Sequence, residues 1–140
     1  GSLMRELSKH ISASLKHFDF TTQINDSEEI ESGVEGMYAL LRALPSELES
    51  LYVCVEQWDA FDGAMLASMF ELFPKNLKEV KIFLYNGDYV YDENMTSIAN
   101  CINTSMKQLS SLRIHTRSDA RTGTYRVRNI HTVDEMKAFI

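Results

Sequence analysis

A helix-like segment followed by a strand-like segment recurs four times along this chain of 140 residues, and no other feature constrains its fold as strongly. Each copy is aligned on a leucine that follows the helix-like segment: Leu15, Leu48, Leu77 and Leu109. Apolar residues follow three and five positions after each leucine. Others precede it by eleven and eight positions, and by four positions except at Ser105. The length from helix to strand is therefore constant, whereas the length from strand to next helix varies, as in stacked units.

The helical spacing before each leucine and the alternation after it predict four helix-then-strand units. The expected helices are 3–13, 33–44, 63–73 and 93–105, and the expected strands are 16–22, 50–56, 79–85 and 110–116. Pro45 and Pro74 occupy the same slot in two copies and end their helices, because proline clashes with the preceding turn. Met106 takes that slot in the fourth copy.

Capping residues mark several helix starts. Asp62 and Asp92 are expected N-caps, because a side-chain oxygen there can accept a hydrogen bond from an orphan backbone N–H. The segment Ser32–Glu35 fits a capping box, and so does Thr132–Glu135, which predicts a short last helix.

A strand that follows another strand through a helix runs parallel to it, so the four units predict a parallel sheet with helices on one side. The strand residues expected to face the helices are Phe18, Phe20, Leu51, Val53, Val55, Val80, Ile82, Leu84, Leu112 and Ile114. Residues 118–140 depart from the repeat. Alternation on both sides of 119–123 predicts a β-hairpin in which Tyr125–Ile130 pairs antiparallel, and with the last helix it would form a C-terminal cap.

Length and composition fit one packed domain over residues 1–140, since 44% of the residues are hydrophobic. Gly1 and Ser2 resemble the remnant of a cloning tag, so we expect a fragment of a longer protein. No apolar run reaches the about 18 residues of a membrane span, and no membrane partner is expected. The two cysteines, Cys54 and Cys101, are too few for a disulfide framework. We expect free thiols and a cytoplasmic or otherwise intracellular location.

Charge is distributed unevenly along the chain. The net charge of −6 argues against a general nucleic-acid binder. Twelve acids and one base lie between Asp19 and Glu71, whereas five arginines and one acid lie between Arg113 and Arg128. The pattern fits two solvated faces of opposite sign. It also fits a basic edge that binds a partner, or contact between copies of the chain.

The repeated segments LKHFDF (15–20), LESLYV (48–53), LKEVKI (77–82) and LSSLRI (109–114) resemble those of the leucine-rich repeat superfamily, in its ribonuclease-inhibitor-like form. The resemblance covers about residues 3–117. It implies a short solenoid with helices on the convex side, and protein recognition on the open strand face. The family's usual Asn or Cys after the strand is replaced by Gln23, Glu56, Tyr85 and Arg117. A flat α/β sheet, such as a small anti-sigma-antagonist-like regulatory domain, is the structural alternative.

The strand residues between the buried ones form the candidate site. If the units are in register, these residues form lateral rows on the helix-free face. The candidate protein-binding residues are Tyr52, Lys81, Phe83, Tyr85, Arg113, His115 and Arg117. Tyr and Arg are enriched in binding hot spots, and Phe83 is a large apolar residue on a face without helices. The alternative is that a loop or neighbouring repeats cover this face.

No catalytic pattern is apparent, and we expect a non-enzymatic module without cofactor or metal. The histidines lack metal-ligand spacing. Cys54 and His115 would lie two strand spacings, about 10 Å, apart, well beyond the about 3 Å that a nucleophile and its base require. Acids near Trp58, namely Glu56, Asp59 and Asp62, read as ordinary loop acids. The expected partner is another protein, with self-association as part of an oligomerisation or structural segment the alternative.

Overall fold

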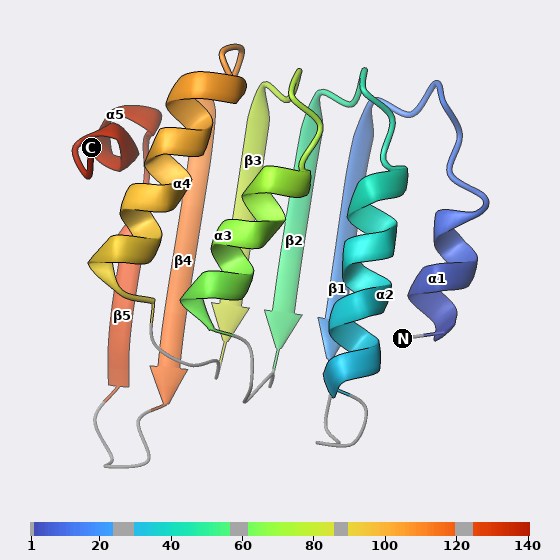
Figure 1. Ribbon diagram of the computed structural model, residues 1–140, viewed down its shortest axis with the longest axis horizontal. Coiled ribbons are helices and arrows are strands. Elements are labelled where there is room, and N and C mark those ends of the chain that lie inside the picture. Colours follow the sequence, from blue (N-terminus) through green and yellow to red (C-terminus); the bar gives the residue numbers. More distant parts are fainter. Residues whose placement is uncertain (1, 24–29, 57–61, 86–89, 120–124) are drawn as a thin grey trace.

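A five-stranded sheet with helices against one face forms the frame of the protein (Figure 1). The computed structural model describes residues 2–23, 30–56, 62–85, 90–119 and 125–140. The strands lie side by side in chain order, and they are β1 (His17–Gln23), β2 (Ser50–Glu56), β3 (Glu79–Tyr85), β4 (Ser111–Asp119) and β5 (Tyr125–Ile130). The helices are α1 (Ser2–Ser8), α2 (Ile30–Ala43), α3 (Gly63–Leu72), α4 (Asp92–Ser105) and α5 (Val133–Lys137).

The strand directions confirm the predicted parallel sheet. β1 to β4 pair in parallel, and β4 pairs antiparallel with β5. Each connection from β1 to β4 passes through one helix and steps in the same direction across the sheet. Because such crossovers are right-handed, helices of successive steps fall on one face. Figure 1 accordingly shows α2, α3 and α4 together in front of the strands.

The strand register is the one that the leucine alignment predicts. Leu51 lies between Phe18 and Val80, and Val80 lies beside Leu112. Eight of the ten residues predicted to face the helices are buried. The two others, Phe18 and Phe20, are only partly buried, because β1 is the edge strand and has a neighbour on one side only.

The helix side of the core is filled by α2, α3 and α4 together, with α3 between the other two (Figure 1). Leu66, Met69, Phe70 and Phe73 are at most 1% exposed, and the rings of Phe70 and Phe73 lie 4.8 Å apart. Fully burying a side chain of this size contributes about 1.5–3 kcal/mol. α2 and α4 contribute side chains that are just as fully buried, among them Met37 and Ile98.

The helix starts agree with the sequence only in part. Asp62 caps α3 as predicted, since its Oδ1 accepts the Met65 N–H at 2.9 Å. Asp92 is not the N-cap of α4 but its first residue, because the cap position falls on Tyr91. The Tyr91 N–H donates to Asn94 Oδ1 at 2.9 Å. Asp92 lies in the first helical turn, where its negative charge interacts favourably with the positive end of the helix dipole.

Two further helix predictions were wrong. The first helix ends at Ser8 instead of residue 13, and the N–H groups of Lys9 and His10 bond three residues back in tight turns. The Ser8 hydroxyl also donates to the Arg5 carbonyl, which competes with continued helix. The second helix already begins at Ile30, so Ser32 lies inside it and is not its N-cap.

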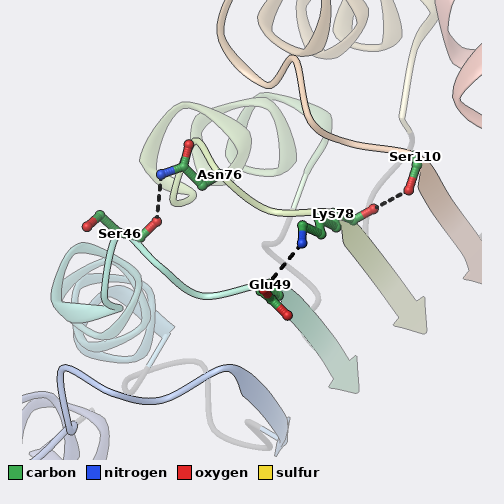
Figure 2. Close-up of polar contacts among 5 residues, drawn as sticks. All are labelled: Ser46, Glu49, Asn76, Lys78 and Ser110. Atoms are coloured by element: carbon green, nitrogen blue, oxygen red, sulfur yellow. Dashed lines mark hydrogen bonds and ion pairs between the residues drawn. The ribbon is translucent and has the colours of Figure 1, made fainter.

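The turns between helix and strand repeat the same backbone bonding from unit to unit. The Lys16 carbonyl accepts the N–H groups of Glu49 and Ser50, at 2.8 and 3.1 Å. The Glu49 carbonyl accepts the N–H groups of Lys78 and Glu79, and the Lys78 carbonyl accepts those of Ser110 and Ser111. We call this repeated backbone bonding the carbonyl ladder. Side chains reinforce this ladder: Lys78 Nζ lies 3.3 Å from Glu49 Oε1, and Asn76 Nδ2 donates to the Ser46 carbonyl (Figure 2).

This carbonyl ladder explains why the helix-to-strand length is constant. Each strand must begin directly beside the strand to which it is bonded. A residue gained or lost at the turn would therefore point the buried side chains of the following strand to the opposite face of the sheet.

The C-terminal residues close the far edge of the sheet as a hairpin strand and a short helix. Thr132 Oγ1 accepts the Glu135 N–H at 3.0 Å, which confirms the predicted cap. The Glu135 carboxylate accepts a backbone N–H one residue earlier than expected, from His131. Ile130 and Met136 bury against the common core. The predicted hairpin turn falls largely at 120–124, outside the described residues.

Candidate functional site: the open face of the sheet

The face of the sheet opposite α2–α4 carries the residues proposed from the sequence. Successive strand side chains point to opposite faces, so residues between the buried positions point here. The pairing places Asp19, Tyr52, Lys81 and Arg113 in one row, Thr21, Cys54, Phe83 and His115 in the next, and Glu56, Tyr85 and Arg117 in the third. We call the outward side chains of β1–β4 the open face.

Four ring side chains form a contiguous cluster at the centre of the open face. The Phe83 ring lies 5.4 Å from that of Tyr52, 5.9 Å from that of His115 and 6.4 Å from that of Tyr85. Tyr85 and His115 are themselves 5.7 Å apart. All four side chains are half-buried, although no helix covers them. We call Tyr52, Phe83, Tyr85 and His115 the ring cluster.

Basic side chains border the ring cluster. The guanidinium carbon of Arg113 lies 5.6 Å from the centre of the Phe83 ring, which is a cation–π distance. Lys81 Nζ lies 3.3 Å from Glu79 Oε1 in an exposed ion pair, which partly neutralises this lysine. Arg117 is exposed beside Tyr85 in the next strand.

The terminal strand β5 holds one member of the ring cluster in place. His115 Nδ1 is hydrogen-bonded to Asn129 Oδ1, across the antiparallel pair of β4 and β5. An amide oxygen only accepts, so this bond requires the tautomer in which Nδ1 carries the proton, and it orients the imidazole ring. Sequence reasoning missed Asn129. The pairing of Ile114 with Ile130 puts Asn129 opposite His115, and this register depends on the length of the hairpin turn, which sequence alternation does not set.

Cys54 lies in the middle row but is only 6% exposed, since its neighbours on both sides cover it. Its Sγ lies 3.9 Å from Glu56 Oε1. Burial, and then the Glu56 carboxylate, raise the pKa of the Cys54 thiol. The thiol therefore stays protonated at neutral pH and is a poor nucleophile. Phe83 lies between Cys54 and His115 in the row, as predicted.

Charge changes sign across the open face. Asp19 on β1 and Glu56 on β2 are acidic, whereas Arg113 and Arg117 on β4 are basic. Partial burial also raises the pKa of the Tyr52 phenol, so this hydroxyl is a neutral donor between the two halves. The face thus combines an acidic edge, a ring cluster and a basic edge within four strands.

The structure brings the seven proposed site residues together on adjacent strands. Tyr52, Lys81, Phe83, Arg113 and His115 surround one another in two neighbouring rows, and Tyr85 and Arg117 adjoin them in the third. The arginines of residues 121–128 that completed the proposed basic edge have no described side chains.

The described part of the chain contains neither a cluster of metal ligands nor a membrane-spanning helix. Among the described residues, no group of three or more His, Cys, Asp or Glu side chains is arranged to hold a metal ion. Within the same residues, no helix combines the length and the apolar character needed to cross a membrane. Trp58 and Asp59 lie outside the described residues.

Comparisons with models of protein families, with curated proteins and with solved structures found no match to this chain. The resemblance to leucine-rich repeats therefore stays a prediction from the residues that carry it.

Proposed function

We propose that this domain is a non-enzymatic recognition module that binds another protein on the open face of its sheet. The observation that carries the proposal is the half-buried ring cluster, with Arg113 against Phe83, on a face without helices. Rings and arginines that are already packed against one another lose little side-chain entropy on binding, which favours affinity.

The composition of the face supports recognition over a merely solvated surface. Tyr and Arg are enriched among residues that dominate binding energies, and they cluster near the centre of interfaces with polar groups around them. Tyr52, Tyr85 and Arg113 fit this arrangement around Phe83, with Asp19 and Arg117 at the rim.

For the architecture, we propose stacked leucine-rich-repeat-like units in preference to a flat regulatory α/β domain. Two features support this. The strands follow chain order with their crossover helices on one face (Figure 1), whereas doubly wound sheets carry helices on both faces. In addition, the carbonyl ladder repeats at Lys16, Glu49 and Lys78 with the spacing of the leucines.

A selection experiment tests the function and needs no natural partner in hand. Peptides are selected from a random library on the immobilised domain, and their sites are mapped by amide chemical shifts. We expect the shifts to centre on β3 and β4. We also expect Phe83→Ala to weaken binding by about tenfold or more, as for a hot-spot residue.

The matched control is Lys107→Ala, which alters an exposed residue in the turn after α4, away from the open face. It should leave affinity unchanged. Ligands that map to the helix side, or that bind Phe83→Ala as tightly as the original chain, would overturn the proposal.

A further inference from the structure

The charges of the open face are arranged so that the face complements itself. Asp19 is exposed on β1 and Glu56 half-buried on β2, while Arg113 and Arg117 are exposed on β4. Between them, Glu79 and Lys81 form an ion pair, so β3 adds little net charge. One edge is therefore negative and the other positive, with the ring cluster in between.

We propose that the protein bound by the open face is a second copy of this chain, packed face to face about a two-fold axis parallel to the strands. This inference rests on the proposed function, that the open face recognises a protein, and names the partner. Rotation about such an axis lays β1 of one copy over β4 of the other. Each row stays at the same height along the strands. Asp19 then meets the partner's Arg113, and Arg113 meets the partner's Asp19.

The same rotation also places the inner strands favourably. β2 lies over β3 of the other copy, which puts Tyr52 against the partner's Lys81 and Glu56 against the partner's Tyr85. The first contact is cationic on aromatic, and the second lets a phenol donate to a carboxylate. Contacts of opposite sign thus occur at both edges, as an isologous interface requires.

The other face-to-face arrangement is unfavourable. A two-fold axis perpendicular to the strands would lay each strand over its own copy in the reverse direction. Arg113 would then meet the partner's Arg117, since both lie two residues from His115 on β4. Like charges directly opposite each other destabilise an interface. The charge pattern therefore selects the axis parallel to the strands.

The size of the face predicts a weak, reversible dimer. Four strands spaced by about 4.8 Å and seven residues rising about 3.3 Å each give a flat area of about 19 by 23 Å. Even with surface roughness, this lies near the lower limit of about 600 Å² per partner for specific interfaces. We expect a dissociation constant on the order of micromolar or weaker.

Charge reversal followed by mixing tests the arrangement. In Asp19→Arg, residue 19 has the same sign as the partner's Arg113 opposite it, and in Arg113→Glu, residue 113 has the same sign as the partner's Asp19. Each variant alone should dimerise at least about tenfold more weakly than the original chain. In an equimolar mixture the reversed edges complement each other, so the mixed dimer should form again. Sedimentation velocity across a range of concentrations measures all three cases.

Controls separate this result from trivial effects. Glu71→Arg and Lys107→Glu make the same charge changes at exposed positions away from the open face and should leave dimerisation unaltered. Added salt should weaken the dimer, because the screening length falls from about 8 Å at about 0.15 M to about 3 Å at about 1 M. Thermal unfolding checks that each variant is folded.

The outcomes distinguish self-pairing from the general proposal. A chain that stays monomeric at high concentration, or a mixture that shows no recovery, overturns the self-pairing. If such a monomer still binds selected peptides on the open face, recognition survives with a different partner. If it binds none there, both proposals fail.

Discussion

Gly63 occupies a position where any larger residue must disturb the neighbouring helix. It is the first residue of α3, and a Cβ there would overlap Asn94 Oδ1 and lie 2.5 Å from Asn94 Cγ. Asn94 Oδ1 accepts the Tyr91 N–H at the start of α4. The substitution Gly63→Ala must therefore displace the amide that caps α4.

The size of the effect follows from these contacts. Losing a capping bond costs about 0.5–2 kcal/mol, typically about 1. Crowding against Asn94 Cβ, 3.1 Å from the new methyl group, adds to this. We expect Gly63→Ala to lower the free energy of unfolding by about 1–2 kcal/mol, which corresponds to about 3–6 °C in Tm.

A double-mutant cycle isolates the contact. Asn94→Ala alone loses the same bond to Tyr91 and should cost about 1 kcal/mol. In the double variant, the methyl group added at position 63 meets no amide, so the cost should stay close to that of Asn94→Ala. The two changes should therefore be non-additive by about 1 kcal/mol.

Equilibrium unfolding in urea, followed by circular dichroism, gives the four free energies. The slope with denaturant should be the same for all four proteins, because the exposed area on unfolding does not change. Additive costs would show that residues 63 and 94 do not contact each other. A stabilised Gly63→Ala would show that helix propensity outweighs the lost cap.

Further predictions concern the core, the last helix and the buried thiol. Phe70→Ala, in the core, should destabilise the protein by about 3–5 kcal/mol, whereas Phe83→Ala, half-exposed on the open face, should cost about 1 kcal/mol. Urea unfolding that gives similar costs would place Phe83 in the core. Thr132→Ala should remove the cap of α5, speeding amide exchange there, while Thr132→Ser should not; equal exchange in both would contradict the capping role. The pKa of the Cys54 thiol is raised in the folded protein. The thiol's contribution to the free energy of unfolding is therefore fully present below the unfolded pKa, and it is lost as the pH rises through the folded pKa. Unfolding free energies at alkaline pH should therefore fall less steeply in Cys54→Ala, and an unchanged slope would refute the shift.

The sheet was predictable because apolar spacing encodes both its order and its register. Aligning Leu48, Leu77 and Leu109 places Leu51, Val80 and Leu112 at equivalent positions, and the structure pairs the three in one row. A parallel sheet of this kind leaves little freedom, since shifting a strand by one residue would expose its buried face.

The helix ends were harder to predict, because they depend on competition between alternative capping hydrogen bonds. Asp92 has the composition of an N-cap, but Asn94 reaches back to Tyr91 and moves the start by one residue. Ser32 and Glu35 have the spacing of a capping box but lie within α2, a chance match to a short motif.

The candidate site was predictable as a set of positions but not as a surface. The rows through Tyr52 and Phe83 follow from strand alternation. The burial of Cys54 by its neighbours in the row does not follow from alternation, because it depends on the size and tilt of side chains in neighbouring strands. The bond from His115 to Asn129 required the register of a hairpin whose turn length the sequence leaves open.

The carbonyl ladder makes each unit's junction the same as the next. Lys16, Glu49 and Lys78 offer one acceptor each, and every following strand offers the same pair of donors. Removing residues 49–77 would join Leu48 to Lys78, and the donors of Lys78 and Glu79 would then face the Lys16 carbonyl. The backbone thus permits whole repeats to be excised or duplicated, so the length of this sheet can be engineered one unit at a time.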